Sequence, residues 1–130
     1  KDPRPFLEEA GADAEKAAEL HPKSPNVWST LAEYHLLRAR WLVAGGKPAE
    51  ADITGGLKAA DAGLAVNPEF APTLAHRAFL VALKAQGEKD PGRAKSRVDA
   101  NALVAEARAA HPPAATRLEL KECEELLGEK

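Results

Sequence analysis

Apolar residues recur along the chain with the spacing of helices. In segments 10–22, 56–68 and 100–112, small apolar residues follow one another at steps of four and three, which places them on one face of a helix. No segment alternates convincingly between apolar and polar residues, so no sheet is expected. The pattern predicts an all-α protein of about six helices. Their expected ranges are 5–20, 25–44, 53–66, 72–86, 92–110 and 114–127.

Prolines divide these helices at a nearly regular interval. Proline lacks an amide hydrogen and disfavours helical geometry in the residue before it, so helices usually end there. Pro22, Pro68 and Pro112 each close an Ala-rich run, and they lie 46 and 44 residues apart. A helix end that recurs at a nearly fixed interval along the chain predicts a repeat architecture.

Polar residues next to prolines and turns mark the expected helix starts. We expect Ser24 to cap a helix whose first residue is Pro25, and Asp90 to cap one that begins at Pro91. Asp52 or Thr54 is the expected cap of the helix between them.

The three Ala-rich runs align without gaps. The residues that share a position are Ala10, Gly56 and Ala100; Ala14, Ala60 and Val104; and Ala17, Gly63 and Ala107. Because Ala and Gly side chains are small, such a face lets two helix axes approach closely. The runs are therefore expected to form tightly packed helical hairpins.

These features resemble the tetratricopeptide (TPR) repeat family over nearly the whole chain. The matching residues are Trp28, Leu31 and Ala32 in one helix, Gly56, Ala60 and Gly63 in its partner, the closing LAVNP at 64–68, and Leu74, Ala78, Ala100, Val104, Ala107 and Pro112 in the next unit. The units are longer than the usual length of about 34 residues, and Arg77 stands where Leu31 stands in the unit before.

The resemblance implies one domain, 1–130, forming a right-handed α-solenoid of antiparallel helix pairs. Its units would be 1–22 (partial), 25–68, 71–112 and a terminal helix at 114–130.

The chain also resembles the region following the catalytic domain of some bacterial serine/threonine protein kinases. The resemblance lies in elongated Ala-rich repeats and in short sequence segments such as RARWLVAGG and NP. The chain has no kinase motif of its own: neither a Gly-rich loop, nor HRD, nor DFG. It has no initiator Met and begins in the second helix of a unit. We therefore expect a fragment of a larger bacterial signalling protein.

Composition narrows the range of partners. The 18 basic and 20 acidic residues give a formal charge of −2, which provides no general attraction to nucleic acid or to an anionic membrane. The longest apolar runs are too short to span a bilayer, and no signal peptide is visible. A single cysteine, Cys123, fits a reducing compartment. These observations favour a cytoplasmic protein.

Candidate chemistry is sparse. His21 and His111 stand just before closing prolines, where a polar side chain can satisfy helix-end groups. His35 and His76 lie on different helices and are expected to be structural or exposed, and Cys123 to be a buried or half-buried thiol. No residue pair has metal-ligand spacing. The sequence predicts no enzyme activity, no cofactor and no metal site.

The remaining hypothesis is a protein or peptide interaction module. The TPR resemblance implies a partner-binding groove on the concave face of the stacked first helices. The candidate residues are Ser29, Glu33, Leu36, Leu37, Arg40, Ala75, Phe79 and Leu83. These residues could instead only pack adjacent helices together. A second hypothesis is a structural element that docks another domain, or a second copy in a homodimer, through the ends of the stack.

Overall fold

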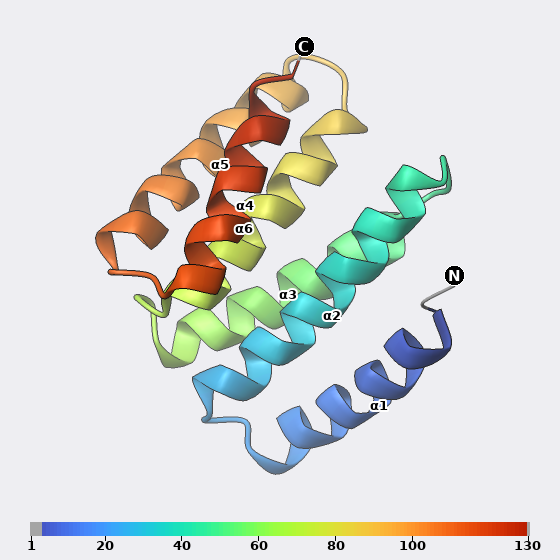
Figure 1. Cartoon of the computed structure of the whole chain (residues 1–130), viewed down its shortest axis with the longest axis vertical. Helices are drawn as coiled ribbons and strands as arrows, with labels where there is room; N and C mark the ends of the chain where they lie inside the picture. The colour runs from blue at the N-terminus through green and yellow to red at the C-terminus, as the bar shows by residue number, and fades with distance from the viewer. Residues whose placement is uncertain (1–3, 130) are drawn as a thin grey trace.

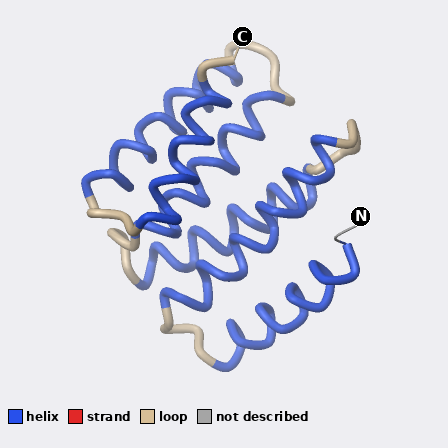
Figure 2. The backbone as a smooth tube through the Cα atoms, in the orientation of Figure 1, coloured by secondary structure: helices blue, strands red, loops and turns tan. Residues whose placement is uncertain are grey.

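The computed structural model describes residues 4–129 and forms six α-helices in that range (Figure 1). They are α1 (Arg4–Leu20), α2 (Pro25–Ala44), α3 (Glu50–Val66), α4 (Ala71–Gln86), α5 (Gly92–Ala109) and α6 (Ala114–Leu127). Only helices and the turns that join them occur among these residues (Figure 2), which confirms the all-α prediction. Residues 1–3 and 130, at the ends of the predicted domain, lie outside the described residues.

The helix starts differ from the expected caps. Helix α3 begins at Glu50, so Asp52 and Thr54 lie inside it, and the prediction that one of them caps it is wrong. Asp52 is buried and accepts a hydrogen bond from His35 of α2, so its carboxylate holds two helices together. Ser24 is the N-cap residue of α2, but its side chain makes no capping hydrogen bond. Asp90 Oδ1 accepts the Ala94 amide 3.2 Å away, while α5 begins just after Pro91, at Gly92.

The helices contact one another in a regular order. Helices α2, α4 and α6 pack side by side, with α4 in the middle. Helices α1, α3 and α5 contact even-numbered neighbours, and among the described residues they do not contact one another. Consecutive helices run antiparallel (Figure 1).

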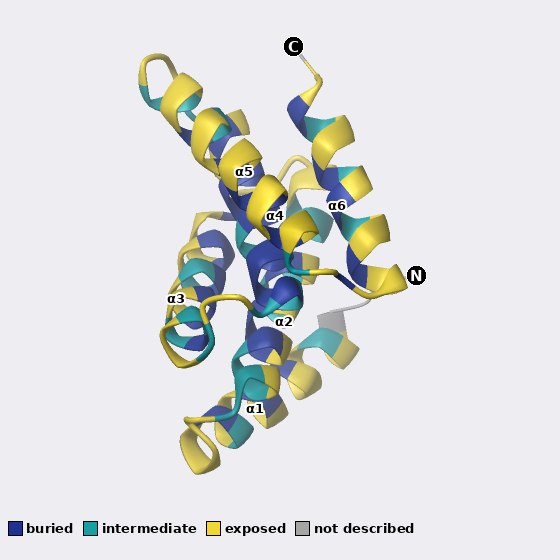
Figure 3. Cartoon of the chain, turned by 90° about the vertical axis from the view of Figure 1, so that its left-hand side faces the viewer, coloured by how far each residue is buried: buried dark blue, intermediate teal, exposed yellow. Residues whose placement is uncertain are grey.

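Helix α4 is the centre of this arrangement. It contacts α2, α3, α5 and α6, and 12 of its 16 residues are buried. The largest fully buried side chains include Leu36 of α2, Leu80 of α4 and Leu120 of α6. Burial along α4 is evident in the edge-on view (Figure 3). None of the described helices has the length and apolar character needed to cross a bilayer.

The small residues of α3 and α5 lie in helix interfaces, as predicted. Gly56, Ala60, Gly63, Ala100, Val104 and Ala107 are all buried. A Cβ atom on Gly63 would lie 2.8 Å from Trp28 Cβ, closer than atoms can pack. On α1 the prediction fails for Ala10, which is exposed, because this helix has α2 as its one neighbour and turns Gly11 toward Tyr34 instead.

Candidate functional site

Most of the predicted groove residues lie inside the molecule. Ser29, Leu36, Ala75, Phe79 and Leu83 are buried. They are covered because α2 and α6 both pack against α4, whose side chains fill the space between them. These residues therefore form no open apolar surface, and their positions agree with the alternative that they pack adjacent helices.

The other three predicted residues, Glu33, Leu37 and Arg40, reach the surface of α2 to different extents. The exposed fraction of Leu37 is 43%, and the Arg40 side chain is about one-third exposed. The Arg40 guanidinium pairs with Glu122 of α6 at 3.0 Å and lies 4.5 Å from the centre of the Phe79 ring. An ion pair thus joins α2 to α6 across the buried face of α4.

A second polar cluster lies on the same three helices. His76 of α4 is buried, with Nδ1 2.7 Å from Glu119 Oε2 of α6. Its Nε2 atom lies 3.8 Å from Glu33 Oε2 of α2. The cluster therefore connects a buried imidazole to two carboxylates from different helices.

From the sequence alone His76 is expected to be structural or exposed, and no metal-ligand spacing indicates this cluster. Glu33 and His76 are 43 residues apart, as are His76 and Glu119. The equal spacing was the available signal. An alignment of the repeats on their closing prolines does not reveal this spacing. The prolines lie 46 and 44 residues apart, so the three residues fall at different distances from them.

The other paired histidine, His35, has a structural environment. Its Nδ1 lies 3.0 Å from Asp52 Oδ1, and Arg38 Nε lies 3.3 Å from the other oxygen of this carboxylate. A Cβ atom on Gly55 would lie 2.9 Å from the His35 ring, so the ring is packed closely against α3. The hydrogen bond that Arg38 donates to the Tyr34 hydroxyl raises the pKa of Arg38, and the Asp52 charge adds to this effect. These contacts join α2 to α3 and leave little room for a ligand.

The remaining candidates show no reactive arrangement. Cys123 is buried, and burial raises the pKa of its thiol to about 12, with Glu119 and Glu124 adding to the shift. At neutral pH this thiol is protonated and therefore a poor nucleophile. His21 and His111 are exposed, and the helix ends beside them are closed by their backbone amides, which donate to the carbonyls of Ala17 and Arg108.

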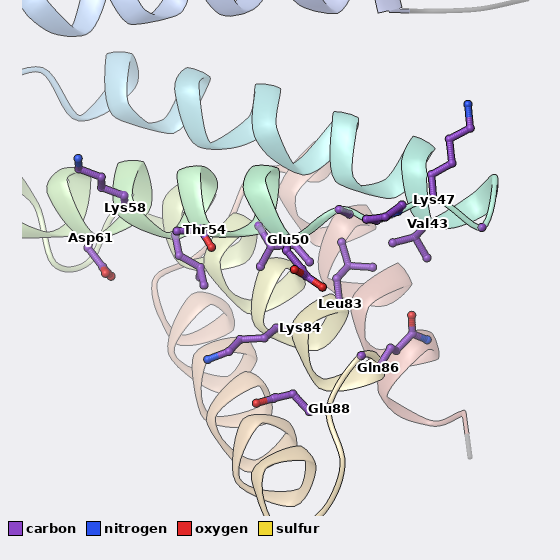
Figure 4. A pocket seen from close by; sticks show the side chains of 16 residues that line it. Val43, Lys47, Glu50, Thr54, Lys58, Asp61, Leu83, Lys84, Gln86 and Glu88 are labelled. Atoms are coloured by element: carbon purple, nitrogen blue, oxygen red, sulfur yellow. The ribbon is translucent and has the colours of Figure 1, made fainter.

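A groove with a cavity volume of about 1010 Å³ lies between α3 and the end of α4 (Figure 4). Helices α3 and α5 both pack against α4, but in the described range they do not contact each other. Apolar side chains line it from the end of α2, from α3 and from α4: Val43, Ile53, Leu57 and Leu83. Of the residues predicted to bind a partner, Leu83 alone lines this groove.

The rim of the groove carries charges that are unevenly paired. Asp61 pairs with Arg77 at 2.8 Å, and Glu88 accepts a hydrogen bond from the Ser96 hydroxyl. Lys58 and Lys84 are exposed, and no described carboxylate lies within 4.0 Å of either ammonium group. The Arg77 guanidinium therefore offsets the charge of Asp61, whereas no ion pair among the described residues offsets the charge of Lys58 or Lys84.

Comparisons of the chain with protein-family models, with curated proteins and with solved structures find no match.

Proposed function

We propose that the chain is a non-catalytic protein-interaction module with a TPR-like, right-handed solenoid arrangement. The alternating contact pattern supports this arrangement, because helices two apart in the sequence stack through α2, α4 and α6. In a solenoid each unit contacts its neighbours in this way. With the resemblances described above, the proposal extends to a cytoplasmic segment of a larger bacterial signalling protein, in the manner of the region that follows some kinase domains.

The groove between α3 and α4 is the proposed binding site. One observation carries the proposal: apolar side chains line the groove, and two lysines on its rim, Lys58 and Lys84, have no ion-pair partner among the described residues. Val43 is 39% exposed and Leu57 is half-buried, so part of this lining is open to solvent, and exposed apolar surface marks binding sites more often than ordinary surface does. On the predicted concave face Leu37 is the exposed apolar candidate, and the Arg40–Glu122 ion pair joins α2 to α6 there.

The rim charges indicate the chemistry of the partner. No described carboxylate lies within 4.0 Å of the Lys58 or Lys84 ammonium group, and Lys47, on the same rim, lies 5.6 Å from the centre of the Trp41 ring. Against them, Glu50 is the acidic rim residue for which no ion pair or hydrogen bond is found among the described residues. These rim lysines favour a partner segment that is an acidic amphipathic helix, with its apolar face on Val43 and Leu57. Charge complementarity of this kind steers association and selects partners.

The test uses a fluorescent synthetic helix with leucines at i, i+3, i+4 and i+7 and glutamates on the flanking positions. Fluorescence anisotropy should show saturable binding to the wild-type chain. The double variant Lys58→Glu, Lys84→Glu should bind the peptide more weakly by about tenfold or more, equivalent to 1.4 kcal/mol. The matched control Lys16→Glu, Lys95→Glu carries the same change of charge on exposed positions of α1 and α5 and should bind as the wild type does.

Two results would count against the groove. One is equal binding by the wild type and a folded Lys58→Glu, Lys84→Glu variant. The other is equal binding of a control peptide whose glutamates are replaced by lysines, since this would show that the rim charges select nothing.

Self-association through the end of the stack is the second candidate function, and the outer surface of α1 favours it. Phe6 is 76% exposed and Leu20 is 65% exposed, although both are large apolar residues. If this surface pairs two copies, sedimentation should show a mass that rises with concentration, and Phe6→Ser, Leu20→Ser should restore the monomer. A monomeric mass at all concentrations would exclude this function.

A further inference from the structure

The cluster of Glu33, His76 and Glu119 has the composition of a metal site. Each residue offers a ligand atom, and these atoms all lie within 4.8 Å of one another. The residues come from α2, α4 and α6, so the cluster is formed by the fold and not by a local motif. Nothing in the proposed peptide-binding groove involves these three side chains.

The hydrogen bond to Glu119 prepares His76 to bind a cation. A carboxylate 2.7 Å from Nδ1 favours the tautomer that carries its proton there, which leaves the lone pair on Nε2. Metal-binding histidines commonly donate their second ring N–H to a carboxylate, because this fixes the ring and makes the ligating nitrogen more basic. The His76 side chain is 6% exposed, so packing also holds the ring in place.

Glu33 lies opposite the available nitrogen. Its Oε2 atom is 3.8 Å from His76 Nε2. Two ligand atoms bound about 2.1 Å from a tetrahedral zinc ion lie about 3.4 Å apart, so a small rotation of the Glu33 side chain is enough to form both bonds. The Glu33 side chain is 54% exposed, which leaves a path for the ion and for water ligands.

The electrostatic environment favours a cation. Within the described residues, no lysine or arginine lies within 4.0 Å of the Glu33 or Glu119 carboxylates. Arg40, on the same face, is already paired with Glu122. No lysine or arginine therefore offsets the negative charge of these two carboxylates by direct contact.

We propose that Glu33 and His76 bind a divalent transition-metal ion such as Zn²⁺, with Glu119 as the positioning residue of this site. His76 Nε2 and Glu33 are the direct protein ligands, water completes the coordination, and Glu119 positions the imidazole. An imidazole ligand favours Zn²⁺ and related ions over Mg²⁺ and Ca²⁺, which prefer oxygen alone. The bound ion links α2 to α4 and, through Glu119, to α6, and so stabilises the packing of these three helices.

The test measures Zn²⁺ binding by the metal-free wild-type chain with isothermal titration calorimetry at pH 7.5, together with thermal unfolding. We expect one ion per chain and a higher midpoint of thermal unfolding in its presence. His76→Gln should abolish this binding, and Glu33→Gln should weaken it by more than tenfold. Glu119→Gln should weaken it by about tenfold, the lower end for loss of a residue that orients a ligand. The control His21→Gln, His111→Gln removes two exposed histidines and should bind as the wild type does.

A measurement on the wild type keeps the proposal testable if the His76 variant does not fold. NMR should show Zn²⁺ shifting the His76 ring nitrogens while the His35 ring nitrogens stay in place. The proposal is overturned if no binding is detected at millimolar Zn²⁺. It is also overturned if binding persists in folded His76→Gln or disappears in the His21, His111 control, because surface histidines would then be the ligands.

Discussion

The thiol of Cys123 lies among core residues of α6 and is fully buried. Glu119 and Glu124 disfavour the negative charge of a thiolate at this position. Burial is the larger cause, and together these effects raise the pKa of the thiol from 9.0 to about 12. At this position the environment therefore favours an inert thiol.

This shift predicts a loss of stability in alkaline solution. The unfolded chain releases the thiol proton above about pH 9, whereas the folded chain keeps it until about pH 12. The contribution of Cys123 to the free energy of unfolding is therefore fully present below pH 9 and falls as the pH rises toward 12. Urea unfolding at pH 8 and pH 10 should show a steeper fall for the wild type than for Cys123→Ala. Equal falls in the two proteins would contradict the prediction.

At the scale of single helices, the contact between α2 and α3 depends on small side chains. Gly63 faces Trp28, and a Cβ atom there would lie 2.8 Å from Trp28 Cβ. Because a Cβ atom is fixed to its backbone, the clash can be relieved only by moving one helix away from the other. The fully buried Ala60 lies one turn earlier on the same helix.

We therefore predict that Gly63→Leu or Ala60→Leu lowers the free energy of unfolding by roughly 1–3 kcal/mol through overpacking. Ala65→Leu is the matched control, because Ala65 is exposed on the same helix and the same substitution there should change stability little. Chemical denaturation followed by circular dichroism measures the difference. Equal stability of Gly63→Leu and Ala65→Leu would show that this face of α3 is not tightly packed.

The helices themselves could be predicted from the sequence, because their limits depend on local chemistry. Pro22, Pro68 and Pro112 stop helices wherever they lie, and most observed bounds fall within a residue or two of the expected ones. The observed start of α3 differs from the expected one because Asp52 does not cap the helix. Its carboxylate instead forms a hydrogen bond with His35, 17 residues away.

The candidate sites could not be predicted in the same way, because they depend on how the helices pack. Phe79 and Leu83 have the spacing of an exposed apolar face, but whether they reach solvent depends on where α6 lies. The groove beside α3 is lined by residues of α2, α3 and α4, so it depends on how three helices pack, which no single segment encodes. The equal spacing of Glu33, His76 and Glu119 was visible in the sequence, but only the fold shows that their side chains meet.

At the scale of the whole molecule, the six helices are unequally supported. Helix α4 has four neighbours, whereas α1 packs against α2 alone. Local opening of a structure requires less free energy where fewer contacts must be broken.

Hydrogen exchange should reveal this difference. We predict that the backbone amides in the middle of α1 exchange faster than those in the middle of α4, which should approach the protection expected for global unfolding. Mass spectrometry of exchanged peptides measures both helices in one experiment. Equal protection of α1 and α4 would show that the chain opens as a single cooperative unit.

The alternating contact pattern also has a consequence for how quickly the chain folds. Apart from the Arg40–Glu122 ion pair between α2 and α6, each described helix packs against partners no more than two helices away in the sequence, and α1 and α6 do not pack against each other. Few long loops must close before favourable contacts form, so the topology has a low contact order. Helical proteins of this kind fold on the order of microseconds to milliseconds. The chain can therefore form most of its core by packing helices that are near one another in the sequence, before segments that are far apart in the sequence come together.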